Sequence, residues 1–261
     1  MHSLTGMKRI LIAACLIACT TTPVTNRKQL NLIGDDTINK LGVQTYQQEL
    51  SKVKLDQDPN HVAMVDRVTR RIADAAESSF HPGYQWEAKV IDDPKTVNAW
   101  CMPGGKIAVY SGIFQLAQND QDLAVVLGHE TSHALAHHSA ERLSRMELMQ
   151  LGEQGILAAV GTKSPNAVKM VGAALGIGSQ LGVELPFSRQ QEQEADHIGL
   201  ILMAKAGYDP SVAVDFWQKM VAYSKGKEPP AFLSDHPSSE SRVADIQKEL
   251  PEARANFVAH R

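Results

Sequence analysis

Most of the chain arranges hydrophobic and polar residues with the three- and four-residue repeat of an amphipathic helix. Pro59 suits the first turn of one such helix, which we expect to continue to about Ser79. Its apolar face is formed by Val62, Val65, Val68 and Ile72. Further helices are expected at 36–54, 119–143, 188–207 and 208–224, as a Gly/Ala-rich pair over 145–183, and at the C-terminal end.

One stretch before the midpoint of the chain departs from this repeat. Residues 84–91 alternate weakly between apolar and polar, which favours a strand. Residues 97–102 and 106–112 flank Pro103-Gly104-Gly105, which predicts a hairpin. A chain of 261 residues can bury one sizeable core. We therefore expect a single, mostly helical α+β domain over 36–261.

The N-terminus has the pattern of a bacterial lipoprotein leader. Two basic residues precede an apolar run that ends at Cys19 and is too short for a permanent membrane span. We expect 1–18 to be a signal peptide and Cys19 to carry lipid, with Cys15 as a second candidate. An ordinary cleaved signal or a short buried helix is the alternative. The polar, Pro-containing residues 19–35 are expected to form a tether.

Composition narrows the classes of function. The net charge of -3 gives no reason to expect a nucleic-acid partner. Of the three cysteines, the one at 15 would leave with the signal and the one at 19 would be lipidated. Cys101 would then be alone, so no internal disulfide is expected.

The segment from His129 to His133 is an H-E-x-x-H motif. Four residues advance a helix by about one turn, so the two imidazoles share a face and can bind one ion. Zinc suits two imidazoles and a carboxylate and leaves a fourth position for water. Glu130, beside that pair, is placed to take the proton of the activated water. A chance match is disfavoured because the surrounding residues are apolar, and buried charge is costly unless paired or metal-bound.

The motif needs a third ligand from elsewhere in the chain. His137 follows His129 by eight residues, or about 12 Å along a continuous helix, so one ion cannot reach both. We expect His137 and His138 to be solvated or hydrogen-bonding residues near the helix end. In "EQEAD", Glu192 and Asp196 share one helix face; one can bind zinc and the other can accept the free N–H of a ligand histidine. Spacing leaves Glu194 as an alternative ligand, and a solvated acidic helix as the non-functional interpretation.

Four segments together resemble a known family. "NAWCMPGGKIAVYSG", "HETSH", "SRQQEQEAD" and "DHPSSESR", in this order, look like the HtpX and CaaX-prenyl-protease zinc metallopeptidases, and most like their soluble periplasmic lipoproteins of the BepA-like and LoiP-like type. The resemblance covers roughly residues 25 to 250. It implies a gluzincin-like zincin fold with a small antiparallel sheet over the active-site helix, and one Zn²⁺ per chain. It also implies that Glu192 is the third ligand and that Asp196 supports the helix histidines.

Two departures from the family limit what is carried over. The integral-membrane relatives have transmembrane helices, and we expect none here. BepA-like proteins carry a C-terminal helical-repeat domain, for which we find no counterpart before Arg261.

The same resemblance indicates substrate-binding residues. Asn98, Ala99 and Trp100, with Gly104 and Gly105, match the family's edge strand above the zinc cleft. An edge strand can pair with an extended peptide through its backbone. An ordinary hairpin is the alternative interpretation.

His236 and Arg242 are candidate catalytic residues in "DHPSSESR". Facing the cleft, they could stabilise the oxyanion of a tetrahedral intermediate. In BepA-like relatives the matching histidine can also bind the zinc and close the site, so we expect His236 either to assist catalysis or to gate it. A capped loop before the last helix is the alternative.

We therefore expect a zinc endopeptidase on the periplasmic side of a Gram-negative outer membrane, held by its lipid anchor. The resemblance implies misfolded or misassembled envelope proteins as substrates, and the outer-membrane assembly machinery as a possible partner. The main alternative is a periplasmic chaperone or assembly factor with a closed zinc site. A non-peptidase hydrolase would leave the edge strand without a purpose.

Overall fold

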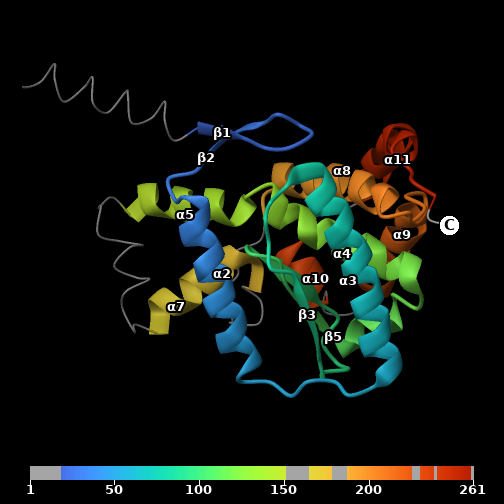
Figure 1. Ribbon diagram of the computed structural model, residues 1–261, viewed down its shortest axis with the longest axis horizontal. Coiled ribbons are helices and arrows are strands. Elements are labelled where there is room, and N and C mark those ends of the chain that lie inside the picture. The colour runs from blue at the N-terminus through green and yellow to red at the C-terminus, as the bar shows by residue number, and fades with distance from the viewer. Residues whose placement is uncertain (1–18, 151–164, 178–186, 225–229, 238–239, 260–261) are drawn as a thin grey trace, which may run out of the picture.

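The computed structural model describes residues 19–150, 165–177, 187–224, 230–237 and 240–259 (Figure 1). Helices dominate and the strands are short, which confirms the α+β prediction. The helices are α2 (Asp35–Leu50), α3 (Pro59–Phe80), α4 (Asp120–Leu135), α5 (His138–Gln150), α7 (Pro165–Gly172), α8 (Arg189–Lys205), α9 (Val212–Ser224), α10 (Ala231–Asp235) and α11 (Glu240–Ala255), with η1 (Ser111–Gln115) and η2 (Ala173–Ile177). The strands are β1 (Cys19–Thr21), β2 (Lys28–Leu30), β3 (Glu87–Ile91), β4 (Ala99–Met102) and β5 (Lys106–Tyr110). Within these ranges, none of the helices has the length and apolar character needed to cross a bilayer.

The main sheet has the order β3-β5-β4. The predicted hairpin is present, because β4 pairs antiparallel with β5 with Ala99 opposite Val109. The sheet is mixed rather than antiparallel throughout, since β3 pairs parallel with β5. This order places β4 at one edge, next to α4, which packs against it.

Helix α4 is the centre of the core. Asn119 caps it, accepting a bond from the Asp122 amide with its side chain, and from Asp122 to Leu135 every residue is buried. It packs against α3, α8, α9 and β4. A helix buried on all sides can hold polar groups only if they are paired or bind an ion.

Helices α4 and α8 cross at two glycines. A Cβ on Gly128 would lie 3.1 Å from the Gly199 carbonyl oxygen, and one on Gly199 would lie 3.1 Å from the Gly128 carbonyl carbon. Only the absence of both side chains allows the backbones to approach this closely. The crossing brings the H-E-x-x-H turn of α4 beside the acidic turn of α8.

The expected continuous helix over 119–143 is wrong. The structure ends α4 at Leu135 and starts α5 at His138. Between them His137 adopts a left-handed conformation with φ of 54°, which no continuous right-handed helix accommodates. The chain therefore turns at His137, and the distance along a straight helix does not apply to His138.

Residues 19–35, which the sequence assigned to a tether, contain a hairpin instead. Strands β1 and β2 pair antiparallel, with Cys19 opposite Leu30. Figure 1 shows this hairpin at the periphery, near α5, and β2 contacts α5. Thr22 and Gln29 are buried, so this segment packs on the domain.

Candidate metal centre

Two histidines of α4 point their ring nitrogens at one another. His129 Nε2 and His133 Nε2 lie 3.1 Å apart, and each residue is 2% exposed. One helical turn separates them, which gives both rings the same direction. Two buried imidazoles this close need an ion or a proton between them.

Helix α8 brings Glu192 to this pair. Its Oε2 lies 3.5 Å from His129 Nε2 and its Oε1 lies 3.5 Å from His133 Nε2. The structure places Glu194 on another side of α8, where it bonds His138 and Arg27. Of the two carboxylates that the spacing left open, Glu192 is the one that faces the histidines.

His236 completes the cluster from the segment after α10. Its Nδ1 lies 3.2 Å from His129 Nε2 and 3.0 Å from Glu192 Oε1. One ligand atom from each of His129, His133, Glu192 and His236 falls within 4.8 Å of the others. Tetrahedral zinc with ligands at ~2.1 Å separates them by about 3.4 Å. The separations of 3.0 to 3.5 Å therefore fit a zinc ion.

Glu130 lies at the side of this cluster, as its position after His129 requires. Its Oε1 lies 3.4 Å from His236 Nε2, and the residue is 3% exposed. Burial raises the pKa of Glu130 to about 7. A carboxylate with such a pKa can both take and return a proton near neutral pH.

Asp196 and Arg242 bond the ligand residues His129 and Glu192 and fix their orientation. Asp196 Oδ1 accepts from His129 Nδ1 at 2.9 Å, which leaves His129 Nε2 for the metal. Arg242 donates to both oxygens of Asp196, at 2.6 and 2.8 Å, and its Nη1 lies 2.8 Å from Glu192 Oε2. Burial acts to raise the pKa of Asp196, but Arg242 and the His129 bond outweigh it and hold this pKa below its usual value.

The setting of Arg242 differs from the predicted one. The side chain is 5% exposed and its guanidinium lies 3.7 Å from the ring centre of Trp217. It is directed at two carboxylates rather than at an open cleft, so its arrangement suits orienting ligands. Trp217 was not foreseen, because an aromatic residue in an apolar helix carries no signal of a site.

His138, which we grouped with His137, has a different environment. It is 0% exposed and its Nδ1 lies 2.8 Å from His133 Nδ1. His137 is half-buried and lies 3.4 Å from Asp35. Of the two expected environments, solvated or hydrogen-bonding, His138 thus has the second. No sequence signal separated it from its neighbour.

The predicted substrate strand is β4. Asn98, Ala99 and Trp100 are each 1% exposed, and η2 contacts β4. Gly104 and Gly105 turn between β4 and β5 with φ of 86° and 78°, which favours glycine. In this structure β4 is an edge of the sheet but is covered.

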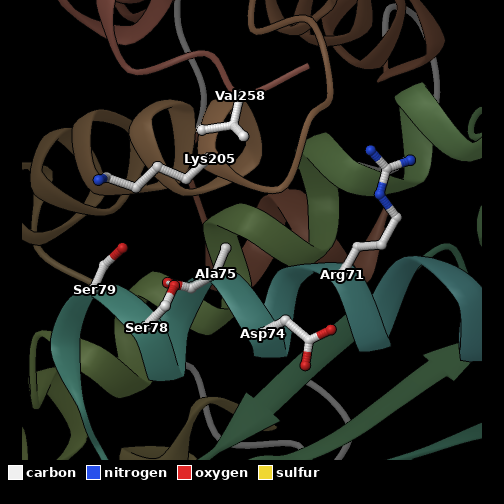
Figure 2. Close-up of a pocket in the computed structure, with 7 residues that line it drawn as sticks. All are labelled: Arg71, Asp74, Ala75, Ser78, Ser79, Lys205 and Val258. Carbon is white, nitrogen blue, oxygen red and sulfur yellow. Dashed lines mark hydrogen bonds between the residues drawn. The ribbon is translucent and has the colours of Figure 1, made fainter. Parts of the chain in front are cut away.

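One small cavity lies against the Asp196 side of the metal cluster. The cavity against His129 and Asp196, also lined by Val125 and Trp217, measures about 10 Å³, the lower limit for one water molecule. A larger hollow of about 660 Å³ lies elsewhere, between α3 and α8. Figure 2 shows it lined by Arg71, Asp74, Ala75, Ser78, Ser79, Lys205 and Val258. The four side chains of the cluster are themselves 1–2% exposed.

The buried H-E-x-x-H helix, the glutamate from a second helix and the zinc-compatible spacing define a zinc metallopeptidase. Residues 59–250 match the model of Peptidase family M48. The chain belongs to this family, which uses zinc, so the metalloprotease and zinc predictions are confirmed.

Named relatives agree with this assignment. The chain is 34% identical to the mitochondrial metalloendopeptidase OMA1 of Schizosaccharomyces pombe, over 89% of the chain and 66% of the relative. It is 32% identical to that of Saccharomyces cerevisiae, over 85% and 64%. It is 30% identical to the beta-barrel assembly-enhancing protease of Escherichia coli, over 62% and 34%. The chain thus spans less than two thirds of the length of each of these relatives.

These relatives correct two expectations. The bacterial protein supports a link to BepA-like proteases, but it aligns over less of the chain than the mitochondrial ones. The expected location on the periplasmic side of an outer membrane is wrong, because the relatives that align over 85% and 89% of the chain are mitochondrial enzymes.

Proposed function

We propose that the protein is a zinc-dependent endopeptidase that cleaves unfolded or misassembled proteins. The observation that carries the proposal is the close spacing of four ligand atoms, from His129, His133, Glu192 and His236, which suits the corners of a zinc tetrahedron. Relatives named as metalloendopeptidases and as an assembly-enhancing protease support the choice of substrate class.

Each residue has a role in hydrolysis. The metal, when bound, supplies a Lewis acid that activates water. Glu130 takes the proton from the attacking water and passes it to the leaving amine. His129, His133 and Glu192 hold the ion, and Asp196 with Arg242 keeps His129 and Glu192 in position.

His236 is the gate of this site in our proposal. A catalytic zinc site keeps one position open, whereas four protein ligands close it. His236 Nδ1 lies 3.0 Å from Glu192 Oε1, in the place that the attacking water would take in the open site. His236→Ala is expected to raise basal proteolysis. If His236→Ala instead lost activity without any such rise, the gating hypothesis would be refuted, and His236 would be a residue that assists catalysis.

Strand β4 is the proposed site for the substrate backbone. It is an edge of the sheet, and adding a peptide in extended form needs little sequence specificity. Since η2 and α10 pack near this edge, opening must expose Asn98, Ala99 and Trp100. That requirement suits substrates that are already unfolded.

Metal analysis of the purified protein with casein as substrate tests the function. The wild type should bind one zinc per chain and cleave casein. Glu130→Gln should bind zinc, fold and fail to cleave. A wild type without zinc, or an active Glu130→Gln protein, would refute the proposal.

A chaperone or assembly factor is the second candidate, and the closed site favours it. The two candidates separate in cells through Glu130→Gln. If this variant kept full biological function, proteolysis would be dispensable and the result would support the chaperone hypothesis.

Lipidation of Cys19 stays a proposal. The predicted signal, 1–18, lies outside the described residues, and Cys19 begins β1. Mass spectrometry of the mature N-terminus tests it. We expect Cys19 to be the first residue and to be acylated. A mature protein that begins at or before residue 19 and carries no acyl group would exclude the lipid anchor.

A further inference from the structure

The two helix histidines are supported differently on the side away from the metal. His129 Nδ1 bonds a carboxylate directly, that of Asp196. His133 Nδ1 instead lies 2.8 Å from another imidazole nitrogen, His138 Nδ1. At this distance one of the two nitrogens must donate and the other accept. The proton's position decides whether His133 Nε2 has a lone pair for the metal.

Glu194 settles which nitrogen donates. Its Oε2 lies 3.0 Å from His138 Nε2 and 2.7 Å from Arg27 Nε. A carboxylate paired with a guanidinium is ionised and only accepts. His138 Nε2 therefore carries a proton, and in a neutral His138 this leaves Nδ1 as the acceptor. His133 must then donate from Nδ1, which leaves its Nε2 unprotonated toward the cluster.

The N-terminal hairpin holds Glu194 in this orientation. The hydroxyls of Thr22, at 2.5 Å, and Thr25 both donate to Glu194 Oε1. Arg27 also donates to both oxygens of Glu141, at 2.9 and 2.8 Å. All three donors lie in or beside the turn between β1 and β2. Arg27 thus ties the hairpin to α5 and α8 at once.

The helix break is what makes this chain of bonds possible. With His137 left-handed, His138 starts a new helix and its ring turns back to His133. Burial of His138 at 0% exposure excludes water as a competing partner.

We propose that His138 and Glu194 are positioning residues for the zinc ligand His133, and that the β1–β2 hairpin, through Thr22, Thr25 and Arg27, is a structural part of the metal site. The inference rests on the proposed zinc site, and it adds a segment that lies outside the matched family range of 59–250.

Zinc affinity of the full chain, measured by competition with a chelator, tests the proposal. His138→Phe and Glu194→Gln should weaken zinc binding about 10- to 100-fold, the range for loss of a partner of a ligand histidine. His61→Phe is the matched control, because His61 also bonds a carboxylate, that of Asp56 at 2.7 Å, but lies away from the cluster. It should bind zinc like the wild type.

The hairpin is tested separately, with variants farther from the core. Arg27→Gln and the double variant Thr22→Val/Thr25→Val should weaken zinc binding by about 10-fold. Arg67→Gln is the control, since Arg67 also binds both oxygens of one carboxylate, that of Asp120. Wild-type affinity in both hairpin variants would overturn the role of the hairpin, even if His138→Phe failed to fold.

Nitrogen-15 NMR of the zinc-loaded wild type gives a readout independent of any variant. His138 should be neutral with its proton on Nε2, and His133 should carry its proton on Nδ1. A proton on His138 Nδ1 would overturn the proposed hydrogen bonding from His133 through His138 to Glu194. A wild type that binds no zinc would instead refute the proposed function, so the two failures are distinguishable.

Discussion

His236 Nδ1 lies 3.0 Å from Glu192 Oε1, although the two residues are 44 positions apart in the chain. Each is almost completely buried, and neither can stay there without a partner. The pair closes the cluster formed by the two helix histidines. In the proposed mechanism, water must replace His236 before the protease can act.

Removing the metal should destabilise the protein. Zinc at about 1,000 times its dissociation constant should add about 4 kcal/mol to the free energy of unfolding, because only the folded chain brings the ligands together. Calorimetry with and without a chelator measures the shift in Tm. The double variant His129→Ala/His133→Ala should show no zinc-dependent rise, and a rise in that variant would place the metal elsewhere.

Replacing Arg242 should be costly. Arg242→Met leaves Glu192 and Asp196 as buried carboxylates without their cation, and we expect a loss of about 3–5 kcal/mol. Arg67→Met removes an exposed pair with Asp120 and should cost less than about 1 kcal/mol. Urea unfolding measures both. Equal losses would show that Arg242 has no special place in the site.

Closing the gap between α4 and α8 should also destabilise the fold. Gly128→Ala places a Cβ 3.1 Å from the Gly199 carbonyl oxygen, and we expect a cost of about 1–3 kcal/mol. Gly34→Ala, whose Cβ would meet nothing within 4 Å, should cost about 0.5 kcal/mol as a change at a helix N-cap. Zinc affinity should fall only in Gly128→Ala, because that crossing sets the distance between the histidines and Glu192.

Glu249 should make stability fall with rising pH. Burial, together with Asp196, Asp245 and Glu252, raises the pKa of Glu249 to about 8, whereas in the unfolded chain it is about 4.3. The stability contribution is therefore complete below about pH 4 and is lost as pH rises through 8.

Glu249→Gln removes this loss. Partial exposure of the side chain screens the effect, so we expect about 1 kcal/mol, or a Tm higher by about 2–4 °C at pH 9. The variant should match the wild type at pH 4. Thermal unfolding across pH 4–9 tests it, with Asp66→Asn, an exposed carboxylate on α3, as control. A constant difference at all pH values would contradict the assigned titration.

The local sequence pattern was sufficient to predict most of the helices and strands, and to predict the two histidine ligands of the metal site. The helix beginning at Pro59, the hairpin around Gly104 and Gly105, and the two histidines one turn apart all depend on residues close together in sequence. Backbone geometry relates such residues through fixed rise and pleat. The error in the long helix came from a single residue, His137, whose left-handed conformation no periodicity reveals.

The sequence by itself therefore determined the class of chemistry, because His129, Glu130 and His133 lie on one helical turn whatever surrounds them. Helix spacing left Glu192 and Glu194 open as the third ligand, and only the family resemblance favoured Glu192. The tertiary structure alone decided that Glu192 faces the histidines while Glu194 does not, that Arg242 contacts two carboxylates, and that His138 and the hairpin support His133. Apart from His133 and His138, which are five positions apart, these contacts join residues 46 to 172 positions apart. They exist because a glycine crossing and a helix break bring separate elements together, and no local propensity encodes that approach.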